Sequence, residues 1–152
     1  MNWGIHVYPG ARREKNLPYD LALSGKGTWF EKRTEELISY TACLDAHSLN
    51  ARTMVAFTES GSTMGRVSKY RPRMNILARA TNQAICGKRV LYWITQLVFV
   101  LTPSSISELF KAAATLSKRL GLAKTGQLIV ITGGIPIGMT GTTNLFKVEI
   151  IS

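Results

Sequence analysis

Hydrophobic and polar positions follow two different periods along most of this chain. Short apolar runs bounded by glycine, proline or polar residues are typical of strands buried inside a sheet. Such runs occupy residues 52–57, 75–78, 97–101, 127–131 and 144–150. Between them, apolar residues recur at helical spacing, which is typical of helices with one buried face. The predicted helices are 34–50, 64–70, 82–93 and 104–120.

The last of these helices has the clearest pattern. Ser104 or Ser105 can cap its amino end, and Gly121 stands where glycine most often ends a helix. Its apolar stripe consists of Ile106, Leu109, Phe110, Ala113, Leu116 and Leu120. We therefore predict that one face of this helix packs on the sheet.

The order of the elements predicts the fold class. Strands that alternate with helices through short connections form right-handed βαβ units and a mostly parallel sheet. No helix separates 127–131 from 144–150, which favours antiparallel pairing of these two strands. We predict an α/β fold with three layers, α/β/α, around a mixed, mostly parallel five-stranded sheet whose last strand is antiparallel. Residues 1–33 are rich in glycine and proline, so we interpret them as a leader or linker before a domain at 34–152.

Composition excludes several classes of protein. A length of 152 residues with 45% hydrophobic residues suits one domain with a real core. No apolar run reaches the roughly 20 residues of a membrane-spanning helix, and the amino terminus lacks a signal-peptide pattern, so we expect a cytoplasmic protein without membrane contact. Cys43 and His47 have no further ligand at metal-binding spacing, so we interpret them as structural and expect no metal. A disulfide to Cys86 is not expected in a reducing compartment.

Charge narrows the choice of partner. The chain has 19 Lys and Arg against 9 Asp and Glu, a formal net charge of +10. Residues 66–89 contain seven basic residues and no acid. Such a segment suits nucleic acid, an anionic small ligand or an acidic protein surface. Because the sequence has no nucleic-acid-binding motif, we favour an anionic ligand or a protein partner over nucleic acid.

One loop has the composition of a phosphate site. Residues 58–63 follow a predicted strand, and open α/β sheets bind ligands at the carboxyl ends of their strands. The first turn of the next helix offers unpaired N–H groups, and the loop adds hydroxyls and a glycine. The candidate residues are Thr58, Ser60, Gly61, Ser62 and Thr63. The alternative is an ordinary helix cap by Ser60 or Ser62, and Glu59 suits an anion site only if its carboxylate points away.

A second, glycine-rich loop at 133–144 also leaves the carboxyl end of a predicted strand. It lacks the lysine of a P-loop and the glycine spacing of a dinucleotide fingerprint, so the alternative is a plain connector. If the two preceding strands are neighbours, both loops overhang one place. Catalytic side chains are scarce, because the histidines are His6 and His47 and the loop acid is Glu59. We therefore predict no catalytic residues and expect the chain not to be an enzyme on its own.

Residues 58–63 and the segment 66–72 behind them are very similar to the phosphate loop and following helix in the C-terminal domain of pyruvate kinases. Residues 133–148 resemble the effector loop and last strand of that family, and residues 121–126 resemble the turn before its fourth strand. The similarity runs from Thr34 to Ile151. Residues 1–33 show no such resemblance.

The resemblance implies a regulatory domain that binds a phosphorylated allosteric effector, either a sugar phosphate or a nucleotide. The residues at 58–63 would hold the phosphate, and the second loop would close over the ligand. The second-loop residues implied are Gly138, Thr140, Gly141 and Thr142. The resemblance also implies a homo-oligomer with contacts between C-terminal domains.

The family resemblance places catalysis outside this chain. Transfer of phosphate from phosphoenolpyruvate to ADP, giving pyruvate and ATP, would belong to a barrel domain of around 250 residues. That catalytic barrel domain would be a partner of this one and would hold the Mg and K ions. We expect no cofactor in this chain.

Some positions depart from the family pattern. Arg79 interrupts a strand that is usually apolar, and Gln127 occupies a position that is often acidic. Ser62 stands where many members have Arg or Lys, which removes one cation from the phosphate loop. These departures leave the identity of the effector open. The alternative function is a stand-alone domain of the same fold that binds a phosphorylated metabolite.

Overall fold

The structure is a computed structural model of the chain. It describes residues 6–7, 34–80, 96–99, 103–139 and 142–152. The helix predicted at 82–93 lies outside these ranges, as do the predicted site residues Thr140 and Gly141. Most of the segment 1–33 lies outside them as well.

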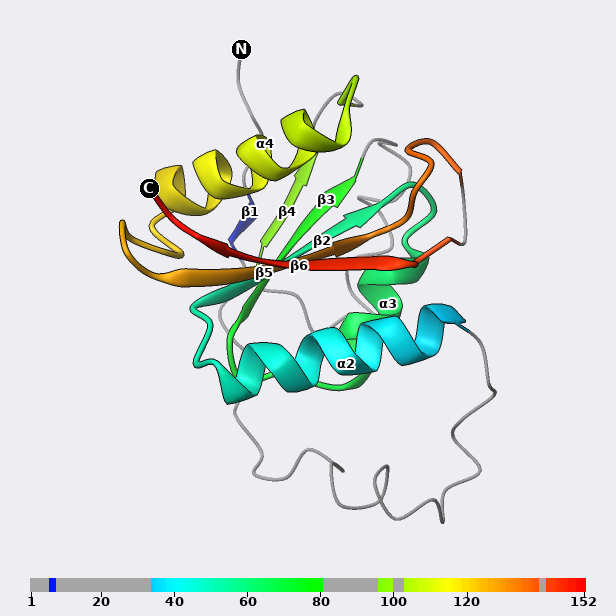
Figure 1. The fold of residues 1–152 in the computed structure, drawn as a ribbon, viewed down its shortest axis with the longest axis horizontal. Helices are drawn as coiled ribbons and strands as arrows, with labels where there is room; N and C mark the ends of the chain where they lie inside the picture. Colours follow the sequence, from blue (N-terminus) through cyan, green and yellow to red (C-terminus); the bar gives the residue numbers. More distant parts are fainter. Residues whose placement is uncertain (1–5, 8–33, 81–95, 100–102, 140–141) are drawn as a thin grey trace.

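The described residues form helices and strands in alternation, as the sequence pattern predicts. The helices are α2 (Thr34–Ser48), α3 (Ser62–Lys69) and α4 (Ile106–Arg119). The strands are β1 (His6–Val7), β2 (Thr53–Thr58), β3 (Asn75–Ala80), β4 (Gln96–Phe99), β5 (Leu128–Gly133) and β6 (Leu145–Ile150). All of them belong to one sheet in the order β1-β4-β3-β2-β5-β6 (Figure 1).

The sheet is mixed. Strands β4, β3, β2 and β5 run parallel, while β6 pairs antiparallel with β5, as predicted for the last strand. Within the described part of the chain, the sheet has six strands instead of the predicted five, because His6 and Val7 pair antiparallel with β4. A strand of two residues has no period for a sequence pattern to reveal. Backbone hydrogen bonds, which carry no side-chain signal, hold such a strand in place.

Helices cover both faces of the sheet. Figure 1 shows α4 on one face and α2 with α3 on the other. On the α4 face, Val55 belongs to the same core cluster as Leu109. On the opposite face, Met54 packs with Cys43 and Val67. Adjacent residues of β2 thus enter different cores, which explains why the whole strand is buried and its sequence shows no alternation.

Two helix ends differ from the sequence prediction for a local reason. Helix α3 begins at Ser62, before the predicted residue 64, because Gly61 has a left-handed φ of 87° and turns the chain directly into the helix. Helix α2 ends at Ser48, and Asn50 follows with a φ of 52°. Asparagine tolerates this conformation better than most residues, and the helix ends two residues before the predicted end at Asn50.

The described residues offer neither a membrane span nor a metal site. No helix among them is both long and apolar enough to cross a bilayer. They also contain no cluster of three His, Cys, Asp or Glu side chains placed to hold a metal ion. Cys43 is a buried thiol whose Sγ lies 3.9 Å from the carbonyl oxygen of Val67. Burial raises its pKa to about 12, as befits a structural cysteine.

Candidate functional site

The loop between β2 and α3 folds around Gly61. The Gly61 N–H donates to Thr58 Oγ1 over 2.8 Å and closes a tight turn at the carboxyl end of β2. Ser60 Oγ donates to Ser62 Oγ over 3.1 Å. No side chain caps α3, so the alternative of an ordinary serine cap is wrong: glycine occupies the cap position. The N–H groups of the first turn therefore have no acceptor within the helix and no capping side chain.

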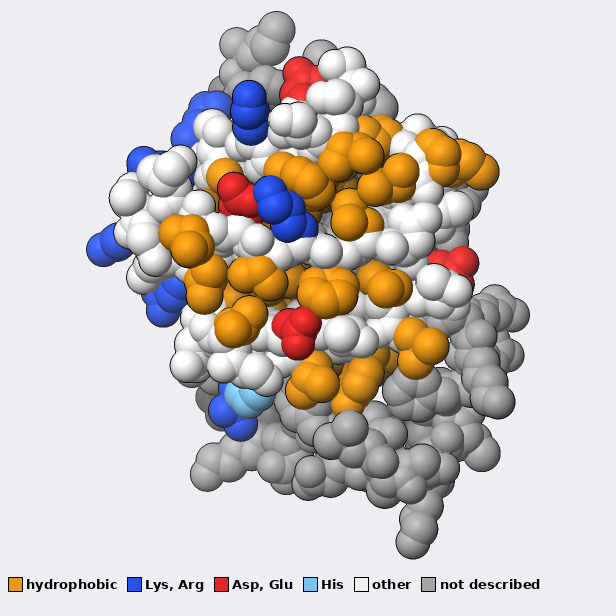
Figure 2. Space-filling model, in the orientation of Figure 1, with side chains coloured by type: hydrophobic (Ala, Val, Ile, Leu, Met, Phe, Trp, Pro, Cys, Tyr) orange, Lys and Arg blue, Asp and Glu red, His pale blue; other side chains and the backbone are white. Residues whose placement is uncertain are grey.

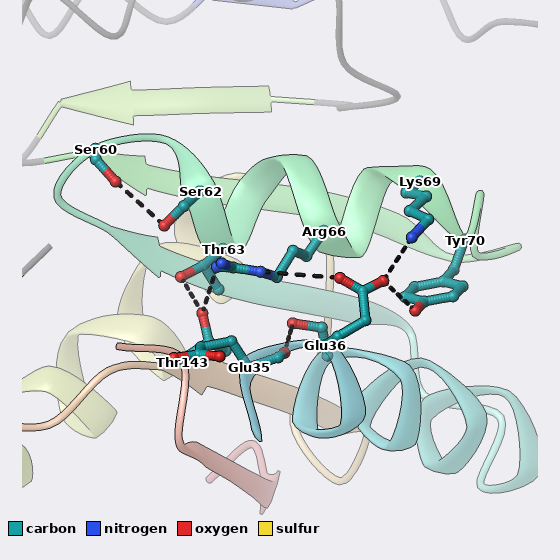
Figure 3. A network of polar contacts seen from close by, with 10 residues as sticks. Glu35, Glu36, Ser60, Ser62, Thr63, Arg66, Lys69, Tyr70 and Thr143 are labelled. Atoms are coloured by element: carbon teal, nitrogen blue, oxygen red, sulfur yellow. Dashed lines mark hydrogen bonds and ion pairs between the residues drawn. The ribbon is translucent and has the colours of Figure 1, made fainter. Parts of the chain in front are cut away.

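The loops that follow β2 and β5 meet at a pair of threonines. Strands β2 and β5 are parallel neighbours, so their carboxyl ends lie at the same edge of the sheet. Thr63 Oγ1 and Thr143 Oγ1 are buried and lie 2.7 Å apart. Arg66 Nη1 is 3.5 Å from the same Thr143 oxygen (Figure 3). The two loops are thus joined at one spot, as the sequence predicts for neighbouring strands.

A small pocket opens between these two loops and the amino end of α4, and we call it the edge pocket. Its volume is about 30 Å³, which suits one small group of a ligand. Five predicted site residues line it: Thr58, Ser62, Thr63, Gly138 and Thr142. The remaining lining residues are Phe57, Glu59, Arg79, Pro103, Leu109, Gly134, Ile137 and Met139. Ser60 and Gly61 do not line it.

The hydroxyls predicted to bind phosphate differ in what they do. Thr58 and Thr63 are buried, and their oxygens hold the loops together through the hydrogen bonds described above. Thr142 Oγ1 donates to the Met139 carbonyl over 3.3 Å. Ser60 is exposed, and Ser62 is half-buried on the wall of the edge pocket. Ser62 is therefore the predicted hydroxyl best placed to meet a ligand.

Arg79 is a lining residue that the sequence pattern marked only as an interruption of an apolar strand. It lies in β3, is 4% exposed, and holds its guanidinium carbon 5.1 Å from the centre of the Phe57 ring. Burial lowers the pKa of Arg79, and the negative charge of Glu108 opposes this shift. A basic residue near the carboxyl end of a buried strand was the signal that could have identified it.

Part of the basic segment 66–89 is engaged within the fold. Glu36 of α2 accepts a hydrogen bond from Lys69 Nζ over 2.7 Å and another from the Tyr70 hydroxyl (Figure 3). Arg66 Nε lies 3.9 Å from the other oxygen of Glu36. Burial pushes the pKa of Glu36 upward, but these hydrogen bonds and positive charges outweigh it and hold the pKa below its usual value. Arg66 and Lys69 therefore tie α3 to α2 and are not part of a free basic face.

The order of the strands, the helices on both faces of the sheet and the loops at one of its edges define an open α/β domain. A small pocket lies at the carboxyl ends of its strands. The sequence matches the family described as "Pyruvate kinase, alpha/beta domain" over residues 36–149. The chain belongs to this family, which confirms the resemblance seen in its two loops.

Individual relatives are pyruvate kinases of bacteria. That of Lactobacillus delbrueckii subsp. bulgaricus is 35% identical over 142 residues, which cover 92% of this chain and 24% of that protein. That of Geobacillus stearothermophilus is 33% identical over 141 residues, covering 93% of this chain and 24% of that protein. That of Clostridium acetobutylicum is 29% identical over 138 residues, covering 91% and 29%.

The similarity covers most of this chain but only part of each relative. This chain spans about a quarter of the length of the curated relatives it matches. In this chain the matches leave less than a tenth uncovered, so they extend into the segment 1–33. The sequence motifs alone showed no resemblance there.

Proposed function

We propose that this chain is a regulatory domain of the pyruvate kinase type that binds a phosphorylated ligand, a sugar phosphate or a nucleotide, at the edge pocket. The main support is the uncapped amino end of α3 beside Ser62. Such an end offers N–H donors and the positive end of the helix dipole to a phosphate. The end also lies where open α/β sheets bind their ligands.

The site is expected to bind bare phosphate only modestly. Each charge-assisted hydrogen bond contributes about 1.5–3 kcal/mol, and the helix dipole contributes about 0.3–1 kcal/mol. Three such bonds, less the cost of ordering the ligand, correspond to roughly millimolar binding. Tighter binding needs a second contact, and the β5–β6 loop supplies it through Gly138 and Thr142 on the pocket wall.

Ser62→Asp tests this site. An aspartate at the first position of α3 suits the helix dipole, so we expect the fold to persist. Its carboxylate would face the pocket and repel a phosphate. Calorimetry with glucose 6-phosphate and with AMP should show binding at least about tenfold weaker than in the unmodified chain.

The matched control is Ser152→Asp, which adds the same charge at the exposed carboxyl terminus. It should bind both ligands like the unmodified chain. Equal affinity in Ser62→Asp and the unmodified chain would mean that the ligand binds elsewhere.

We place the phosphate transfer itself in the part of the relatives that this chain does not span. Phosphoenolpyruvate, ADP and the metal ions would bind a catalytic barrel domain, which is the natural partner of this one. This chain would contribute effector binding and contacts between subunits.

A further inference from the structure

Arg79 carries a charge at a strand position that faces a core. Its side chain is 4% exposed, and Nε and Nη1 have no hydrogen-bond partner among the described residues. An unpaired charge is strongly unfavourable when it is buried, so arginines in such places are normally bonded on most of their N–H groups. The Phe57 ring beneath the guanidinium compensates for part of this, but it accepts no ordinary hydrogen bond.

Two acidic residues lie near Arg79, and neither satisfies these nitrogens. The Glu108 carboxylate is held by Ser104, whose N–H and hydroxyl both donate to it over 2.7 Å. Glu59 lines the edge pocket but makes no hydrogen bond with Nε or Nη1 of Arg79. The pocket therefore contains a guanidinium whose N–H groups at Nε and Nη1 have no acceptor among the described residues.

We propose that Arg79 is the positive charge of the ligand site, and that one oxyanion group binds between its guanidinium and the amino end of α3. Arg79, Ser62 and Thr63 line the same pocket of about 30 Å³, so a single group that enters it can contact both sides. A planar guanidinium matches two oxygens of a phosphate or a carboxylate. Because Ser62 gives the loop no cation, the charge comes from the neighbouring strand β3.

This inference deepens the proposed function, on which it rests for the location of the ligand. It adds the source of the charge and the class of group that enters the pocket. Phosphate esters and carboxylates share the required oxygen geometry. The experiment therefore includes both.

Arg79→Met and Arg73→Met form a matched pair for the test. Both remove one positive charge, but Arg73 is exposed and lies before the amino end of β3. At matched ionic strength, phosphate and sulfate should raise the melting temperature of the unmodified chain and of Arg73→Met by clearly more than that of Arg79→Met. Glucose 6-phosphate should bind Arg79→Met at least about tenfold more weakly.

Stability without any anion gives a second measurement. Arg79→Met should then melt no lower than the unmodified chain, because methionine leaves no unpaired charge in the core. A merely structural arginine would instead leave the variant less stable. If Arg79→Met does not fold, the stability expectation fails, and Arg79→Gln repeats the anion measurements with a polar, neutral side chain and the same expectation for binding.

The outcomes distinguish this inference from the proposed function. If Ser62→Asp weakens phosphate binding and Arg79→Met does not, the ligand site stands and the role of Arg79 is refuted. If citrate stabilises the unmodified chain but not Arg79→Met, while phosphate esters have no effect, the role of Arg79 stands and the phosphate function is refuted. If no anion stabilises the unmodified chain, both are refuted.

Discussion

At the scale of single residues, polar side chains of this domain find their partners far along the chain. Glu36, whose side chain is 15% exposed, joins the start of α2 to Lys69 and Tyr70 at the end of α3. Thr63 finds Thr143 in the other loop. These contacts matter for the site, because Arg66 approaches both Glu36 and Thr143 and so connects the loop pair to α2.

Glu36→Gln should lower the free energy of unfolding by about 1–3 kcal/mol near neutral pH, because the hydrogen bonds lose their charge. The folded-state pKa of Glu36 is below 4.5, so its contribution is present above that value and is lost as the pH falls through 4.5 toward the folded pKa. The difference between variant and unmodified chain should therefore shrink in acid. Urea denaturation as a function of pH measures it.

Glu35→Gln is the control, because it removes the same charge from the same helical turn. It should change stability by less than about 0.5 kcal/mol. A Glu36→Gln variant that is as stable as Glu35→Gln at neutral pH would contradict the importance of the Glu36 contacts.

Residue identity predicted the site only in part. The hydroxyl-rich loop was identifiable because its composition and its place after a strand are both local properties. The sequence did not predict that the hydroxyls of Thr58 and Thr63 form hydrogen bonds within the protein. Their partners depend on how the loop turns and on a threonine from a distant segment. Arg79 was visible as an oddity, but its face of the sheet and its neighbours come only with the strand register.

At the scale of elements, the β5–β6 loop is shaped by a close approach between its two ends. A Cβ added to Gly134 would lie 2.5 Å from Thr142 Oγ1 and closer still to the Thr142 carbonyl oxygen. Only glycine permits this approach. Asn144 also spans the loop, since its side chain exchanges two hydrogen bonds with the backbone of Ile135.

Gly134→Ala should therefore force the loop open. We expect a loss of about 1–3 kcal/mol in the free energy of unfolding, together with weaker binding of glucose 6-phosphate. Denaturation and calorimetry on the same sample measure the two effects.

Gly126→Ala is a control outside this loop. Its added Cβ would meet nothing within 4 Å, so the only penalty is the left-handed φ of 81°. That strain costs about 1–2 kcal/mol, and ligand binding should be unchanged because Gly126 does not line the edge pocket. If Gly134→Ala binds glucose 6-phosphate as well as Gly126→Ala does, the close approach does not position the loop.

Helices and strands with a clear hydrophobic pattern were predictable from the sequence. Features that depend on backbone conformation or on distant partners were not. The run 52–57 has all the marks of a buried strand, and β2 lies there at Thr53–Thr58. The start of α3 depended on the conformation of Gly61, which no periodicity records. The short strand β1 depends on pairing with β4, a partner far along the chain.

At the scale of the whole molecule, β6 forms one edge of the sheet and carries exposed apolar side chains. Its outer side has no partner strand among the described residues, and Val148 and Ile150 are 36% and 63% exposed. Figure 2 shows hydrophobic side chains gathered across the middle of the face on which β6 runs. An exposed edge of this kind is a site for pairing with another chain. We propose that a second copy of this chain covers it, as the family resemblance implies for the oligomer.

Sedimentation velocity over a range of concentrations tests this contact. The unmodified chain should form dimers, and Ile150→Lys should shift the population to monomers. Leu49→Lys alters a residue that is 44% exposed just after the end of α2, and it should leave the dimers intact. A chain that stays monomeric at high concentration would refute the contact.

The position of β6 also affects which backbone edge of the sheet is open to other chains. Without it, β5 would offer an open backbone edge flanked by buried isoleucine and valine, which is the composition of fibril-forming segments. β6 replaces that edge with one that carries Lys147 and Glu149, and charges on an edge strand discourage uncontrolled stacking. If two β6 strands pair about a twofold axis, each strand covers the open edge of the other. Assembly then stops at a dimer and does not continue into a fibre.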